Sequence, residues 1–93
     1  MKMTHVIIEG LVQGVCFRDY TQRQAFILNL TGWVRNLGNG SVEAMLAGAD
    51  QDVAAMLDWL KVGSPRSRVD NLIVEHIESD DKFAGFEVRY QRF

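Results

Sequence analysis

Two kinds of apolar periodicity alternate along this chain of 93 residues, and their order constrains the fold more than any other sequence feature. Apolar residues at every second position predict strands, and spacings of three, four and seven predict helices. Strands are expected over 4–12, 31–37, 41–47, 69–77 and 86–90, and helices over 19–30 and between 50 and 63. We therefore predict an α+β fold with the ferredoxin-like split β-α-β arrangement (βαββαβ plus a short final strand), in which an antiparallel sheet carries two helices on one face.

Local signals predict where several of these elements begin and end. Asn39 and Gly40 favour a tight hairpin between the second and third strands, because both residues tolerate the positive φ angles of such turns. Asp50 is the expected N-cap of the second helix. Asn29 is placed to end the first helix in the left-handed conformation, and Gly63 to end the second helix.

Length, charge and cysteine content narrow the classes of protein to consider. The chain is expected to form one domain over residues 1–93, and its 10 basic and 12 acidic residues leave a net charge of −2. That balance argues against broad binding to nucleic acid, which needs a basic face. The single cysteine cannot form an internal disulfide, and no apolar run reaches the length of a membrane span. We expect a cytoplasmic monomer with no nucleic-acid or membrane partner.

The stretch from Gly10 to Arg18 has the composition of an anion-binding turn. It joins an apolar strand pattern to the first predicted helix, and the N–H groups that begin a helix have no intrahelical partners. Gly14 can adopt the positive φ that lets successive amides form a concave nest of donors. Arg18 adds a planar cation whose donors match two phosphate oxygens. The stretch favours a phosphate-sized ligand, while a purely structural turn remains the alternative.

Histidine and cysteine do not point to a second kind of site. His5 and His76 lie far apart, without further ligands at metal-binding spacing, and are interpreted as sheet or surface residues. Cys16 lies inside the anion-binding turn, but only one residue separates it from Arg18. A loop that short cannot wrap a phosphate between the two side chains, so we expect a passive thiol.

Asn36, at the end of the second predicted strand, is the other candidate. In a split β-α-β sheet the first turn can lie close to neighbouring strands. A carboxamide there can hold a water molecule against a bound phosphoryl group, since it both donates and accepts hydrogen bonds. The structural alternative is an Asx-type hydrogen bond that caps the end of the strand.

Two motifs, in this order and separation, resemble the acylphosphatase family. The first is Gly10-x-Val12-Gln13-Gly14-Val15-x-Phe17-Arg18, followed by Thr21 and Ala25. The second is Gly32-Trp33-Val34-x-Asn36, followed by Gly40-Ser41-Val42. Further matches at Gly63-x-Pro65, Val69 and Phe86-x-Val88 extend the resemblance over essentially the whole chain. The departures from the family pattern are Cys16, Asn29, Ser64 and Arg66, and none of them is at an expected catalytic position.

The resemblance implies an enzyme that hydrolyses the carboxyl–phosphate bond of small acyl phosphates, with no metal ion or organic cofactor. It implies that Arg18 binds the phosphate and that Asn36 orients the attacking water. The implied phosphate cradle consists of the amides of Gln13, Gly14, Val15, Cys16, Phe17 and Arg18.

Three other interpretations share this architecture. The first is a sensing module that binds phosphate without turnover. The second is an RNA-binding domain, which needs aromatic residues on its central strands and a basic sheet face; the third predicted strand, 41–47, holds no aromatic residue. The third is an acylphosphatase-like part of a larger maturation protein, for which the sequence shows no zinc-ligand clusters.

Overall fold

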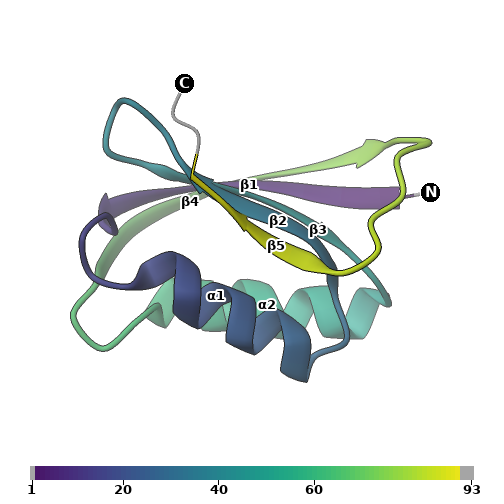
Figure 1. Cartoon of the computed structure of the whole chain (residues 1–93), viewed down its shortest axis with the longest axis horizontal. Coiled ribbons are helices and arrows are strands. Elements are labelled where there is room, and N and C mark those ends of the chain that lie inside the picture. Colours follow the sequence, from purple (N-terminus) through teal and green to yellow (C-terminus); the bar gives the residue numbers. More distant parts are fainter. Residues whose placement is uncertain (1, 91–93) are drawn as a thin grey trace.

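The structure, a computed structural model, describes residues 2–90. Its elements are β1 (Lys2–Leu11), α1 (Phe17–Ile27), β2 (Thr31–Asn36), β3 (Val42–Ala47), α2 (Asp50–Val62), β4 (Arg68–Glu78) and β5 (Phe86–Arg89). The strands form one five-stranded sheet in the order β4-β1-β3-β2-β5, and both helices cover the same face of it (Figure 1). The predicted ferredoxin-like arrangement is confirmed, and β1 is an inner strand.

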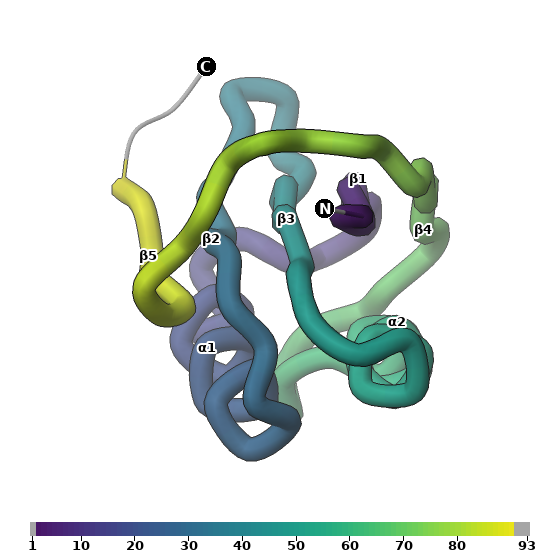
Figure 2. Tube along the Cα trace, turned by 90° about the vertical axis from the view of Figure 1, so that its right-hand side faces the viewer, coloured from purple at the N-terminus to yellow at the C-terminus, as the bar shows by residue number. Residues whose placement is uncertain are grey.

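The last two strands lie at opposite edges of the sheet. The connection over residues 79–85 therefore crosses from one edge to the other at one end of the sheet (Figure 2). Strands β1 to β4 pair antiparallel, whereas β5 runs parallel to β2, with Val88 opposite Val34. The sheet is thus mixed rather than wholly antiparallel, because a crossing connection brings β5 to the far edge in the direction of β2.

The core lies between the sheet and the two helices. The helix-facing side chains of the inner strands are fully buried, as the alternation predicts: Val6, Ile8, Val34, Val42, Ala44 and Leu46. The helix side chains buried against them are Phe17, Thr21 and Ala25 from α1, and Val53, Met56 and Leu60 from α2. Each fully buried aliphatic or aromatic side chain stabilises the fold by about 1.5–3 kcal/mol, so this layer fixes α1 against the sheet.

The residues expected to end the helices take the predicted conformation, but the helix bounds differ from the predictions. Asn29 and Gly63 have φ angles of 57° and 75°, as expected for residues that end helices. However, α1 spans Phe17–Ile27 instead of 19–30. The prediction that Asp50 caps α2 is wrong, because the extended Ala49 is the N-cap and Asp50 is already in the first turn. There its carboxylate complements the positive end of the helix dipole instead.

Residues 37–41 connect β2 to β3 in a hairpin. The Leu37 N–H donates to the Ser41 carbonyl at 2.8 Å, and the Gly40 N–H donates to the Leu37 carbonyl at 3.3 Å. Gly40 has a φ of 94°, but Asn39 does not take the positive φ predicted for it. Its side chain acts instead, since the Asn39 Oδ1 accepts a hydrogen bond from the Ser41 N–H at 3.0 Å. This loop sets the position of Asn36, the last residue of β2.

Candidate active site

The end of β1 turns the chain toward the first helix through a β-bulge. The pairing of β1 with β4 shifts register between Glu9 and Gly10, and such a bulge bends a strand. Gly10 has a φ of 137°, and a Cβ there would collide with the backbone of Arg68. Glycine at this position therefore lets the two backbones approach closely, so that β1 stays paired with β4 through the bulge as far as Leu11.

The loop between β1 and α1 has the backbone of an anion-binding nest. Gly14 and Cys16 have φ angles of 76° and 59°, both in the left-handed region. Cys16 is the N-cap of α1 and makes no side-chain capping hydrogen bond. The first N–H groups of α1 consequently have no capping side chain as an acceptor, which is the arrangement that binds anions at helix N-termini.

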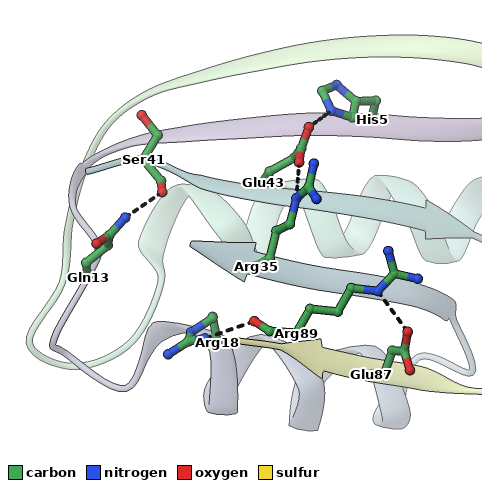
Figure 3. Close-up of polar contacts among 8 residues, drawn as sticks. All are labelled: His5, Gln13, Arg18, Arg35, Ser41, Glu43, Glu87 and Arg89. Atoms are coloured by element: carbon green, nitrogen blue, oxygen red, sulfur yellow. Dashed lines mark hydrogen bonds and ion pairs between the residues drawn. The ribbon is translucent and has the colours of Figure 1, made fainter. Parts of the chain in front are cut away.

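Two side chains hold this loop in place. The Gln13 Nε2 donates to the Ser41 carbonyl at 2.9 Å (Figure 3). It also donates to the Leu37 carbonyl at 2.7 Å, and the two bonds tie the loop to the β2–β3 hairpin. From the other direction, the Ser64 Oγ donates to the Val15 carbonyl at 2.8 Å. Side chains locked in this way keep the loop amides in a fixed geometry before any ligand binds.

Arg18 projects from the first turn of α1 toward the end of β5. Its Nη1 donates to the Arg89 carbonyl at 2.9 Å (Figure 3), and its guanidinium carbon lies 4.7 Å from the centre of the Tyr90 ring. Neither contact is with a carboxylate. The guanidinium keeps its full charge uncompensated by an ion pair in the described part of the chain, and it retains donors for an anion.

Asn36 ends β2 with a buried side chain. The residue is only 7% exposed, and its Oδ1 is a buried side-chain atom without a hydrogen-bond partner among residues 2–90. An unsatisfied buried acceptor typically costs about 1–3 kcal/mol, so it calls for an explanation. The Asx-type cap that stood as the alternative is not formed by this oxygen.

Arg18 and Asn36 line the same cavity, which has a volume of about 290 Å³. The β1–α1 loop, the start of α1, the end of β2 and the residue after β5 surround it. Its lining residues are Val12, Gly14, Cys16, Phe17, Arg18, Asp19, Asn36 and Tyr90. Arg18, the residues at the N-terminus of α1 and Asn36 thus meet around one space of the size of a small ligand.

Most of the residues singled out in the sequence meet here, but two do not line the cavity. Gln13 uses its side chain to hold the hairpin, and Val15 lines an adjoining hollow instead. Sequence reasoning missed Tyr90 and the Arg89 carbonyl, because their part depends on β5 pairing beside β2. No sequence signal for that pairing was available.

A larger cavity of about 660 Å³ lies along β5 and the connection before it. It is lined by residues such as Trp33, Lys82 and Phe86, and by neither Arg18 nor Asn36. Asn36, which carries the one buried side-chain atom that lacks a partner within residues 2–90, lines the smaller cavity. We therefore place the candidate site there.

The histidines occupy structural positions. The His5 Nε2 lies 2.7 Å from a Glu43 carboxylate oxygen, and the His76 Nδ1 lies 2.9 Å from the Thr4 hydroxyl. Within residues 2–90, no three His, Cys, Asp or Glu side chains gather closely enough to hold a metal ion. Within residues 2–90, every helix is too short or too polar to span a membrane.

Comparison with known proteins decides the family. The family model described as "Acylphosphatase" matches residues 4–88. This chain belongs to the acylphosphatase family. An acylphosphatase of Thiobacillus denitrificans is 46% identical over 89 residues, which cover 96% of this chain and 98% of that relative. The chain is therefore an enzyme of this family, an acylphosphatase.

Solved structures agree with the family and the fold. The crystal structure of an acylphosphatase from Bacillus subtilis matches with a TM-score of 0.93 and 33% identity, over 97% of this chain and all of that one. The crystal structure of HypF from T. kodakarensis matches all of this chain with a TM-score of 0.86 and 30% identity, but over only 12% of its own length. The ferredoxin-like acylphosphatase fold therefore also occurs as a small part of a much larger protein.

Proposed function

We propose that this acylphosphatase hydrolyses the carboxyl–phosphate bond of small acyl phosphates to a carboxylate and inorganic phosphate, with Arg18 and the loop amides binding the phosphate and Asn36 orienting the attacking water. One observation carries the proposal. Arg18 and Asn36 line one cavity at the N-terminus of α1, and the Asn36 Oδ1 has no hydrogen-bond partner within residues 2–90.

The phosphoryl group is bound by charge and by directed donors. The N–H groups of the nest at Gly14 to Phe17 and of the first turn of α1 point toward an anion in the cavity. Arg18 adds a planar pair of donors with a permanent charge. Its contacts with Arg89 and Tyr90 hold the guanidinium in place before the substrate arrives, which reduces the ordering needed on binding.

Asn36 supplies an acceptor for the nucleophile. A water molecule that donates one hydrogen to the Asn36 Oδ1 turns an oxygen lone pair toward phosphorus. That water then forms the new P–O bond as the bond from phosphorus to the acyl oxygen breaks. Its proton passes to an oxygen of the substrate's own phosphate group. The carboxamide is neither protonated nor consumed, so its contribution is positioning.

The chemistry explains why such a site suffices. The leaving group of an acyl phosphate is a carboxylate, which departs without protonation by a strong general acid. The remaining demand is stabilisation of charge on the phosphoryl oxygens together with alignment of the water, and positioned donors supply both.

Hydrolysis of benzoyl phosphate in the presence of excess chelator tests the proposal, with p-nitrophenyl phosphate as the monoester control. We expect turnover of the acyl phosphate, none of the monoester, and no effect of the chelator. Phosphate binding without turnover of benzoyl phosphate would favour a sensing module, and hydrolysis of both compounds would indicate a general phosphatase.

A further inference from the structure

A second hollow adjoins the candidate phosphate site. It has a volume of about 170 Å³ and is lined by Gly14, Val15, Cys16, Tyr20, Pro65 and Arg66. Two of these residues, Gly14 and Cys16, also line the cavity that holds Arg18 and Asn36. The anion-binding loop therefore borders both spaces.

The acyl hollow, as we call this space, combines apolar walls with one cation. Val15 and Tyr20 are half-buried and offer apolar surface, and Pro65 adds a rigid edge. The Arg66 side chain is exposed, and no carboxylate pairs with it among residues 2–90. Arg68, by contrast, is paired with Asp70 at 3.0 Å. The guanidinium of Arg66 is thus available to an anion that enters from solvent.

The segment that carries Arg66 is fixed to the phosphate-binding loop. The Ser64 Oγ donates to the Val15 carbonyl at 2.8 Å, and the Ser67 Oγ donates to the Ser64 carbonyl at 2.7 Å. Figure 1 shows this connection between α2 and β4 lying beside the start of α1. The backbone of Arg66 consequently keeps a set position relative to a bound phosphoryl group.

The reaction geometry assigns a direction to the leaving group. In a phosphoryl transfer the attacking and leaving oxygens lie roughly in line through phosphorus. If Asn36 orients the water, the acyl oxygen departs on the side that Asn36 does not occupy. Asn36 lines the phosphate cavity but not the acyl hollow, whereas Gly14 and Cys16 line both.

We propose that the acyl hollow receives the acyl group and that Arg66 pairs with a second anionic group at its far end. The enzyme then prefers acyl phosphates of dicarboxylic acids to those of simple monocarboxylic acids. This inference rests on the proposed function, because it needs the phosphoryl group in the cavity of Arg18 and Asn36. Arg66 is in this account a specificity residue that does not touch the reacting atoms.

A matched substrate pair tests the inference: benzoyl phosphate and 4-carboxybenzoyl phosphate, which differ only in the distal carboxylate. We expect the wild-type kcat/KM to be higher for the carboxylated substrate by about fivefold, the ratio that an exposed ion pair of about 1 kcal/mol supplies. Arg66→Gln should abolish that preference, so that kcat/KM becomes about equal for the two substrates. Arg66→Glu should reverse the preference. Raising the ionic strength should reduce it in the wild type, since salt screens exposed charges.

Arg68→Gln is the control, because it removes the same charge two residues away on an exposed side chain. It should keep the preference for 4-carboxybenzoyl phosphate. A preference that survives Arg66→Gln, or that Arg68→Gln removes equally, would overturn the inference while leaving the proposed function intact. A wild-type protein that hydrolyses neither substrate would overturn the proposed function, and this inference with it.

Discussion

Two polar clusters of this molecule differ in how their hydrogen bonds are satisfied. The sheet cluster, His5, Arg35 and Glu43, lies on the face of the sheet away from the helices (Figure 3). Glu43 accepts hydrogen bonds from His5 and Arg35 at 2.7 and 2.5 Å. Partial burial raises the pKa of the Glu43 carboxyl, but these hydrogen bonds and the neighbouring charges outweigh it, so the pKa lies below its ordinary value of 4.5.

The site cluster, Arg18 and Asn36, is arranged in the opposite way. Arg18 donates to a backbone carbonyl and not to a carboxylate, and the Oδ1 of Asn36 has no partner within residues 2–90. The sheet cluster satisfies its own charges and stabilises the fold. The site cluster keeps donors and an acceptor available, which costs stability and favours a ligand. Whether the hydrogen-bonding groups are satisfied thus distinguishes a structural ion cluster from a binding site, whatever the charge of each.

Removing the cation of the site cluster is expected to have the largest effect. Arg18→Ala should lower kcat/KM for benzoyl phosphate by on the order of 10³-fold, because it removes the charge that stabilises the phosphoryl oxygens. It should also abolish competition by inorganic phosphate. Arg18→Lys should recover little, since a point charge cannot replace a planar fork. Phosphate competition that persists in Arg18→Ala would contradict the binding role.

The carboxamide of the site cluster should affect turnover alone. Asn36→Ala should lower kcat by on the order of 10²-fold, the cost of losing the alignment of the water, while the inhibition constant of inorganic phosphate changes little. Its free energy of unfolding should stay within about 1 kcal/mol of the wild type, since the unsatisfied acceptor disappears with the side chain. Steady-state kinetics and urea denaturation measure the two quantities. A weakened phosphate affinity with unchanged kcat would refute the orienting role.

The sheet cluster should show the reverse behaviour. Glu43→Gln should leave kcat/KM unchanged but lower the free energy of unfolding by about 1 kcal/mol at pH 7, because it weakens two charge-assisted hydrogen bonds.

The pH dependence of this loss follows from the lowered pKa. Below pH 4.5 the unfolded Glu43 binds a proton more readily than the folded one, so its contribution to stability falls as the pH falls through the folded pKa. The difference between wild type and Glu43→Gln should therefore shrink in acid. The exposed Glu75→Gln should change stability by less than about 0.5 kcal/mol. A difference that grows in acid would show that the cluster does not stabilise the fold.

Two substitutions in the β1–α1 loop are expected to have the smallest effects. Cys16→Gly should raise the free energy of unfolding by about 0.5 kcal/mol, because glycine adopts the left-handed φ of 59° without the strain of an L side chain. Gly14→Ala should lower the free energy of unfolding by about 1 kcal/mol, because an L side chain is strained at the positive φ of 76°. The added Cβ would meet no atom within 4 Å, so this backbone strain is the whole expected effect. Urea midpoints compare the two variants. Opposite signs for both would mean that the loop is not held in this conformation.

The sequence predicted the elements well because their signals are local. The alternation around Val42, Ala44 and Leu46 and the stripe of Val53, Met56 and Leu60 need only neighbouring residues to be recognised. Arg18 and Asn36 were predicted from local features, a glycine-containing turn before a helix and the end of a strand, and from the motifs that resemble the family.

The parts that the sequence did not predict depend on contacts between distant segments. Tyr90 meets Arg18 only because β5 joins the sheet parallel to β2. Gln13 lines no part of the cavity because its side chain donates hydrogen bonds to the carbonyls of Leu37 and Ser41 instead. Asp50 carries a typical capping side chain, but the backbone of Ala49 takes the N-cap position. In each case the outcome depends on a distant contact or a backbone conformation that the sequence pattern does not indicate.

The hydrogen bond between Arg18 and the Arg89 carbonyl links residues 71 positions apart. During synthesis on the ribosome, the loop, α1 and the hairpin emerge well before β5. Before β5 joins the sheet, the Arg18 guanidinium therefore lacks the contact that holds it in place. Catalytic competence should appear as one of the last events of folding, after most of the secondary structure has formed, and refolding followed by activity should lag behind refolding followed by circular dichroism.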